Sequence, residues 1–71
     1  MKTKNEITAE AFQIIETYNY VFIDPDQMVI HIKLTSLYRV FNNKSLVKSI
    51  NHLIHNKGYK LGLIQTFDFN D

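Results

Sequence analysis

The chain has no cysteine among its 71 residues, only one proline and only two glycines. Without cysteine there is no disulfide and no thiolate ligand for a structural zinc ion. The scarcity of proline and glycine, together with a hydrophobic content of 45%, excludes a low-complexity or disordered chain. A chain of this length buries only about 60% of the surface of its unfolded form, so it lies near the lower limit for independent folding.

Long hydrophobic runs are also absent. No segment approaches the roughly 18 consecutive apolar residues that a membrane-spanning helix needs. Lys2 and Lys4 are not followed by the apolar stretch of a secretory signal peptide. We therefore expect residues 1–71 to form one small domain, frayed at residues 1–6 and 69–71, with a cytoplasmic location and no contact with a membrane. A homodimer would add buried surface to so small a core.

Acidic residues are missing from most of the chain. Residues 27–67 contain six lysines and arginines and no Asp or Glu, for a net charge of +6. Residues 1–26 hold five acidic residues against two lysines, and Asp68 and Asp71 close the chain, so the net charge of the whole is only +1. Such segregation favours a polyanionic partner, or two faces of opposite charge that meet different partners.

The clearest element is a helix over residues 43–57. Its apolar residues recur with the spacing of one helical face, at Leu46, Val47, Ile50, Leu53 and Ile54. Asn42 or Asn43 can cap the start, and Gly58 can end the helix in a left-handed conformation, with Tyr59 folding back on Ile54. The opposite face carries Lys44, Lys48, Asn51, His52 and His55.

The remaining pattern predicts a mixture of helix and strand. Thr8 can cap a helix over residues 8–18, and residues 20–24 and 28–34 read as a hairpin joined by the turn Asp24-Pro25-Asp26-Gln27. Residues 35–41 fit a short helix or a third strand equally well. Residues 60–67 read as a final strand with Leu61, Leu63 and Phe67 on one side.

The expected fold is therefore α+β, with two helices packed on one face of a small, mostly antiparallel sheet. The element order is helix, strand, strand, a short helix or strand, helix, strand. The expected core consists of Ile7, Phe12, Ile15, Val21, Ile23, Ile30, Ile32, Leu46, Ile50, Leu53, Ile54, Leu61 and Leu63.

The basic part of the chain supplies the first group of candidate binding residues. The start of the 43–57 helix combines exposed N–H groups with Asn43, Lys44 and Ser45, an arrangement that can bind phosphate. Two interpretations remain open: these side chains are simply solvated, or they contact a polyanion or an acidic protein. The full candidate set is Lys33, Arg39, Asn43, Lys44, Ser45, Lys48, His52, Lys57 and Lys60.

Aromatic residues form a second candidate group, because tyrosine is favoured where a ring is buried against a partner and its hydroxyl stays wet. They either cover the sheet or contact a partner protein. An open strand edge could also accept a strand from a second chain. The candidate interface residues are Tyr20, Tyr38, Tyr59, Phe67 and Phe69.

One motif-level resemblance is present. The spacing of Ser45, Val47, Ile50, Ile54 and Gly58 resembles that of the recognition helix of a winged helix–turn–helix domain. The resemblance implies that Ser45, Lys48, Ser49 and His52 face the DNA major groove while Lys44 and Lys60 contact phosphates. It also requires residues 35–41 to be the first helix of the motif, and the strand at 60–67 to belong to a wing hairpin.

Catalytic signatures are missing. There is no cysteine nucleophile, glycine-rich phosphate loop or Gly-x-Ser-x-Gly elbow. His52 and His55, with His31 on the hairpin, could in principle hold a metal, but surface histidines explain them more simply. We expect no enzymatic activity, no metal and no cofactor.

Two hypotheses for function remain. The first is a small protein-binding module, such as an adaptor, an oligomer subunit or a phage-type inhibitor of a larger, nucleic-acid-handling enzyme. The second is a DNA- or RNA-binding module that uses the 43–57 helix. We prefer the first, because a net charge of +1 is low for a dedicated nucleic-acid binder.

Overall fold

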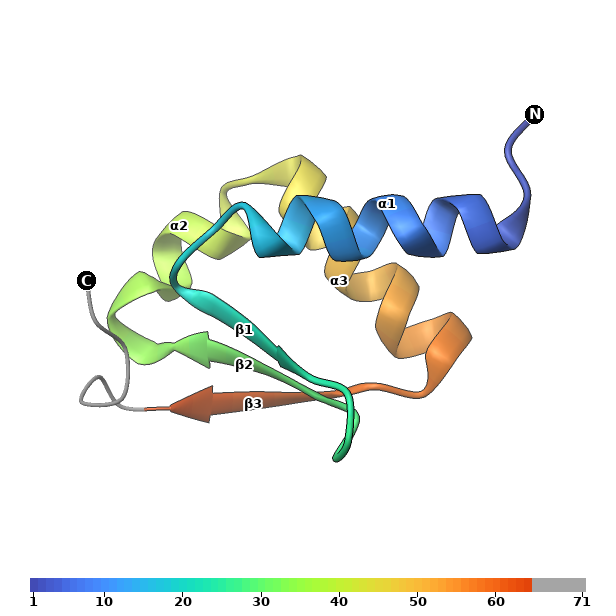
Figure 1. Cartoon of the computed structure of the whole chain (residues 1–71). Helices are drawn as coiled ribbons and strands as arrows, with labels where there is room; N and C mark the ends of the chain where they lie inside the picture. The colour runs from blue at the N-terminus through green and yellow to red at the C-terminus, as the bar shows by residue number, and fades with distance from the viewer. Residues whose placement is uncertain (65–71) are drawn as a thin grey trace.

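The computed structural model describes residues 1–64 of the chain (Figure 1). Helix α1 (Lys4–Glu16) leads into strands β1 (Val21–Asp24) and β2 (Val29–Lys33). A 3-10 turn, η1 (Leu34–Ser36), continues directly into the short helix α2 (Leu37–Phe41). The long helix α3 (Lys44–Lys57) and strand β3 (Lys60–Ile64) follow. Residues 35–41, which the sequence left open between helix and strand, are therefore helical.

The three strands form one sheet in the order β1-β2-β3. Strands β1 and β2 are antiparallel, with Val21 opposite Ile32, whereas β2 and β3 are parallel, with Ile32 opposite Leu63. A parallel pair needs a long crossover connection, which η1, α2 and α3 supply. The α+β class is confirmed, and the helices pack against the sheet, which is mixed rather than mostly antiparallel.

Helix α1 begins at Lys4, four residues before the predicted start at residue 8. Thr3, not Thr8, is its N-cap: the Thr3 hydroxyl accepts from the Glu6 N–H at 3.2 Å, and the Glu6 carboxylate accepts from the Thr3 N–H at 3.2 Å. This reciprocal pair is a capping box, whose signature Thr-x-x-Glu is readable in the sequence. Residues 4–6, expected to fray, form the first helical turn.

The hairpin between β1 and β2 is confirmed, with its turn set by Asp24. One carboxylate oxygen of Asp24 accepts from the Asp26 and Gln27 N–H groups at 3.1 and 3.2 Å, the local bonding typical of an Asx turn. Met28 adopts a left-handed backbone with φ 58° and ends the loop, so β2 starts at Val29 and not at residue 28. The Met28 carbonyl then accepts from the Lys60 N–H at 2.9 Å, at the start of β3.

Helix α3 is confirmed together with both of its predicted ends. The Asn43 side chain accepts from the Leu46 N–H at 3.1 Å, and Gly58 has φ 77°. The N–H groups of Gly58 and Tyr59 both donate to the Leu53 carbonyl, which satisfies one of the carbonyls left free at the end of the helix. Tyr59 is buried and packs edge-on against the Phe12 ring of α1, at 6.0 Å between centroids, where the sequence suggested a contact with Ile54.

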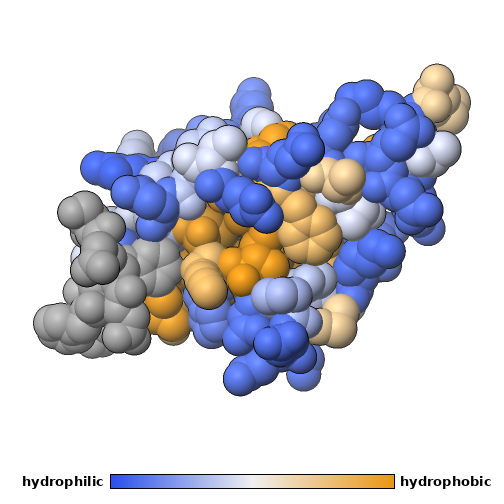
Figure 2. All heavy atoms as spheres, in the orientation of Figure 1, coloured by the Kyte–Doolittle hydropathy of each residue, from blue (hydrophilic) through white to orange (hydrophobic). Residues whose placement is uncertain are grey.

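The core lies between the sheet and helices α1 and α3, with α1 packing on α3 and β1. Figure 2 shows apolar atoms reaching the surface between α1 and the sheet, bordered by hydrophilic residues. The prediction is wrong for Ile7, Leu61 and Leu63, which are 39%, 44% and 55% exposed. Within residues 1–64, no helix covers β3 as α1 covers β1, so the side chains of Leu61 and Leu63 are largely exposed. The buried core consists of Ala11, Ile15, Val21, Ile30, Ile32, Val40, Leu46, Ile50, Leu53 and Tyr59.

Candidate functional site

The nine polar and basic candidate residues do not form one surface. Three of them line a groove between α1 and α3, two line a polar pocket at the end of β2, and the rest are separate. A third, apolar surface lies over α2, α3 and β3. Each of the three surfaces offers a different chemistry.

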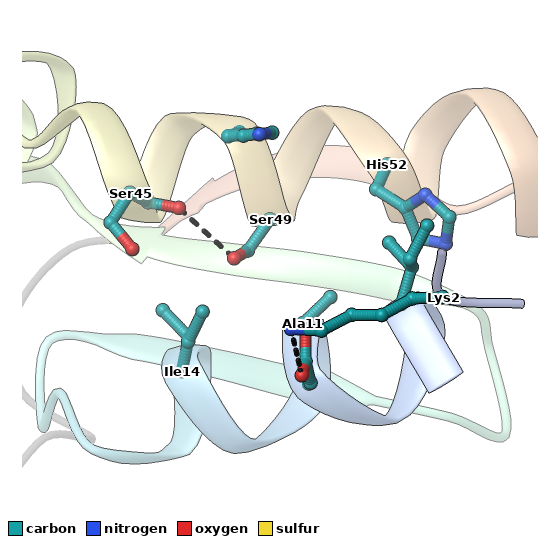
Figure 3. Close-up of a pocket in the computed structure, with 9 residues that line it drawn as sticks. Lys2, Ala11, Ile14, Ser45, Ser49 and His52 are labelled. Carbon is teal, nitrogen blue, oxygen red and sulfur yellow. Dashed lines mark hydrogen bonds and ion pairs between the residues drawn. The ribbon is translucent and has the colours of Figure 1, made fainter. Parts of the chain in front are cut away.

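The groove between α1 and α3 brings together Ser45, Lys48 and His52 (Figure 3), which the period of the helix predicts. Its volume is about 570 Å³, and its opposite wall is α1, with Ala11 and Ile14 facing the serines across it. Glu10 of α1 also lines this groove, where its carboxylate is paired with the Lys2 ammonium. The acid-free character of the 43–57 helix therefore does not extend to the surface around it.

His52 is fixed by hydrogen bonds on both ring nitrogens. Its Nε2 lies 2.7 Å from the Thr8 hydroxyl, which itself donates to the Lys4 carbonyl at 2.9 Å. The Asn56 amide donates to His52 Nδ1 at 3.2 Å. Because the Thr8 proton is used on Lys4, Nε2 carries the ring proton and Nδ1 accepts. His52 thus joins α1 to α3, and this bonding competes with a role as a binding residue.

The described residues of this groove are not arranged as a catalytic site or as a metal site. The Ser49 hydroxyl donates to the Ser45 carbonyl at 3.0 Å, so it is not activated by a neighbouring base. Across residues 1–64, no three His, Asp or Glu side chains are close enough together to hold a metal ion. The arrangement supports packing and polar recognition.

The polar pocket is lined by Lys33 and Arg39 together with Asn19, Tyr20, Thr35 and Ser36, and its volume is about 390 Å³. The sequence named the two cations as candidates but gave no reason to place them together, because they lie on β2 and α2. The serine and threonine beside them were missed. The available signal in the sequence was the pair Thr35-Ser36, which follows Lys33 after a single residue.

The other candidate residues stand apart from both sites. The Asn43 side chain is used structurally, because its oxygen caps α3 and its amide donates to the Tyr18 hydroxyl at 2.9 Å. Lys44 and Lys57 are exposed at the two ends of α3, and Lys60 is exposed on β3. Phosphate binding at the start of α3 would therefore have to rely on Lys44 and backbone N–H groups.

The third surface, here called the apolar face, consists of Phe41, Val47, Ile54, Leu61 and Leu63. Phe41, Val47, Ile54 and Leu61 line a small cavity of about 50 Å³ between α2, α3 and β3. Leu63 follows Leu61 on the same side of β3, as strand alternation requires. Phe41 is 59% exposed, so three large apolar side chains of this face reach solvent. Within residues 1–64, no strand pairs with the outer edge of β3.

The aromatic candidate residues also lie in different environments. Tyr38 is exposed, and Tyr20 is half-buried against Tyr18. The prediction of Tyr59 as an interface residue is wrong, since its ring is part of the core. Phe67 and Phe69 lie outside the described residues. Phe41, which the sequence did not single out, is an exposed aromatic side chain of the apolar face.

The winged helix–turn–helix interpretation fails at the wing. In that fold the strand after the recognition helix turns back in an antiparallel hairpin, whereas β3 pairs in parallel with β2, a strand that precedes both helices. Helix α2, which would be the first helix of the motif, has only five residues.

No protein-family model, curated protein or solved structure matches the chain. None of the helices in residues 1–64 has the length and apolar character needed to cross a membrane.

Proposed function

We propose that the protein is a small, non-enzymatic protein-binding module whose partner covers the apolar face. The observation that carries this proposal is the exposure of Phe41, Leu61 and Leu63 on one face, where Phe41 and Leu61 line an apolar cavity. Clustered large apolar side chains on the surface of a small protein mark interaction sites, since leaving them in water costs free energy. The outer edge of β3, which no other strand of residues 1–64 pairs with, can also donate and accept backbone hydrogen bonds.

Charge defines the chemistry of the partner. Residues 37–64, which contain all of α2, α3 and β3, carry five lysines and arginines and no Asp or Glu. A second copy docked by the same face would bring like charges together, which opposes association. We therefore infer that the partner is an acidic protein segment with apolar anchors. An adaptor or an inhibitor of a larger enzyme fits this description better than a symmetric homodimer.

The proposal is tested by capturing binding proteins from a lysate of the source cells, with the wild type and matched charge variants as bait. Leu63→Glu places an acid in the apolar face, whereas Phe22→Glu places the same charge at a 49%-exposed aromatic on β1, on the other side of the sheet. We expect a partner retained by the wild type and by Phe22→Glu, and lost with Leu63→Glu. Circular dichroism checks that both variants fold. The same proteins recovered with Leu63→Glu as with the wild type would contradict the proposal.

Nucleic-acid binding is the second candidate, favoured by Lys44 and Lys48, which are exposed one turn apart on α3. Fluorescence anisotropy of labelled duplex DNA, single-stranded DNA and RNA at about 50 and 200 mM salt separates the two functions, because phosphate contacts weaken steeply over this range. We expect no saturable binding. Saturable binding that falls with salt, and is lost in the double variant Lys44→Glu, Lys48→Glu, would favour the nucleic-acid function instead.

A further inference from the structure

The groove between α1 and α3 joins an apolar wall to a polar wall that carries Lys48. We propose that it binds a small amphipathic monocarboxylate, such as a medium-chain fatty acid, with the hydrocarbon chain along α1 and the carboxylate at Lys48. The volume of about 570 Å³ lies within the usual range for small-molecule sites, about 300–1,000 Å³. The groove shares no lining residue with the apolar face, so this inference does not depend on the function proposed for that face.

The wall that α1 contributes is apolar. Ile7, Ala11 and Ile14 recur with the period of one helical face, and all three line the groove. Ala11 is buried, but Ile7 is 39% exposed and Ile14 is only half-buried, so part of both isoleucine side chains remains in water. Covering this surface with a hydrocarbon chain is favourable, because apolar area on both the chain and the wall is removed from water.

Small side chains keep the groove open on the side of α3. Ser45 and Ser49 lie opposite Ile14 and Ala11 of α1 (Figure 3). The Ser49 hydroxyl is buried and turned toward its own helix, where it donates to the Ser45 carbonyl at 3.0 Å. The Ser45 side chain is exposed and points into the groove, so its hydroxyl is placed to donate to a carboxylate oxygen.

The charges around the groove favour a ligand with a single negative charge. Lys2 and Glu10 form an ion pair with each other, so their charges cancel. Lys48 is exposed, and among residues 1–64 no carboxylate pairs with it. One lysine is therefore left uncompensated, and one carboxylate is its complement. A ligand with several negative charges would exceed this balance and lie close to Glu10.

The proposal is tested by titrating the protein with sodium octanoate, at constant ionic strength set by chloride, while two-dimensional ¹H–¹⁵N NMR follows the backbone signals. We expect saturable shifts centred on Ala11, Ile14, Ser45 and Lys48. Hexanoate has two fewer methylenes and should bind about tenfold more weakly, at about threefold for each methylene. Octanol, which has the chain without the charge, should also bind about tenfold more weakly. Shifts that do not saturate or that centre on the apolar face, or octanol that binds as tightly as octanoate, would overturn the proposal.

Matched variants then assign the site. Lys48→Gln should weaken octanoate binding about tenfold, the usual loss for a charge-assisted hydrogen bond, and leave octanol binding unchanged. Lys44→Gln removes an equal charge from an exposed position one turn earlier on α3 that does not line the groove, and should leave the affinity for octanoate unchanged. Equal losses with Lys48→Gln and Lys44→Gln would mean that only overall charge is sensed, and would overturn the proposal.

Two further variants separate this site from the apolar face. Ser45→Leu fills the groove from an exposed position and should weaken the binding of octanoate and octanol alike. Leu63→Glu changes the apolar face and should leave octanoate binding unchanged, so the two proposals can fail independently. Circular dichroism checks that both variants fold. A folded Ser45→Leu variant that binds octanoate as the wild type does would place the ligand outside the groove and overturn the proposal.

Discussion

Single polar side chains connect the helices of this protein at the residue scale. The Thr8 hydroxyl joins α1 to His52 of α3, and the Asn43 amide joins the start of α3 to Tyr18, just after α1. Both bonds are partly buried, where removing one partner leaves the other without a hydrogen bond. Thr8 and His52 are 44 residues apart, so no local pattern could reveal their pairing.

Thr8→Val should destabilise the protein by about 1–3 kcal/mol, because the isosteric side chain leaves His52 Nε2 without its partner. Thr17→Val is the matched control: its hydroxyl bonds only the Ile14 carbonyl at an exposed position, so a change of about 0.5 kcal/mol or less is expected. Urea unfolding followed by circular dichroism measures both. Equal losses for the two variants would mean that the link between α1 and α3 contributes nothing specific.

Gly58→Ala should cost about 1 kcal/mol, through backbone strain alone. The nearest side-chain atom to the added methyl group would be Met28 Cε at 3.9 Å, so space is not limiting, whereas φ of 77° disfavours a residue with a Cβ. Gly58→Asn should cost less, because asparagine tolerates the left-handed region better. An alanine variant as stable as the wild type would show that the end of α3 relaxes into another conformation.

At the element scale, the ends of the two main helices are set by caps of the same kind in different surroundings. Thr3 caps α1 at an exposed end, whereas Asn43 caps α3 where the chain packs against Tyr18. The Asn43 cap and the Gly58 stop were predicted, because both interactions are local. The start of α1 was misplaced because Thr3 and Thr8 both fit a cap, and the Glu6 partner of Thr3 was overlooked.

Asn43→Ala should therefore destabilise the protein by about 2 kcal/mol, since it removes a cap and an interhelical bond together. Thr3→Ala should cost about 1 kcal/mol, the usual value for a cap alone. Tyr18→Phe removes only the hydrogen bond that the Asn43 amide donates to the Tyr18 hydroxyl. Its loss of stability should therefore equal the difference between the losses of Asn43→Ala and Thr3→Ala. Urea unfolding measures the free energy of unfolding of each variant. A loss for Thr3→Ala as large as that for Asn43→Ala would contradict this ranking.

At the scale of the whole molecule, burial of the sheet is decided by which strands the helices cover. Ile32 and Leu63 are opposite each other in register and lie on the same face of neighbouring strands, yet Ile32 is fully buried and Leu63 is 55% exposed. Strand alternation placed both in the core. The difference comes from the position of β3 beyond the cover of α1 and α3, and it creates the apolar face.

Ile32→Ala should destabilise the protein by about 3 kcal/mol, through lost burial and the cavity left behind. Leu63→Ala should cost less than about 1 kcal/mol, because most of that side chain is already in water. Denaturant unfolding of the two variants gives the comparison. If Leu63→Ala proved as costly as Ile32→Ala, the apolar face would be part of the folded core and could not be an exposed docking surface.

The sequence by itself determined the elements and their local ends. Periodicity predicted α3 and the hairpin, and it placed Ser45, Lys48 and His52 on one side of a helix, because these features depend on residues at most a few turns apart. Only the tertiary structure decided how the strands pair, and that Glu10 approaches the basic helix. It likewise decided that Lys33 and Arg39 share a pocket and that Leu61 and Leu63 face water. Each of these depends on contacts between distant segments, which are set by packing of the whole chain and leave no local signature in the sequence.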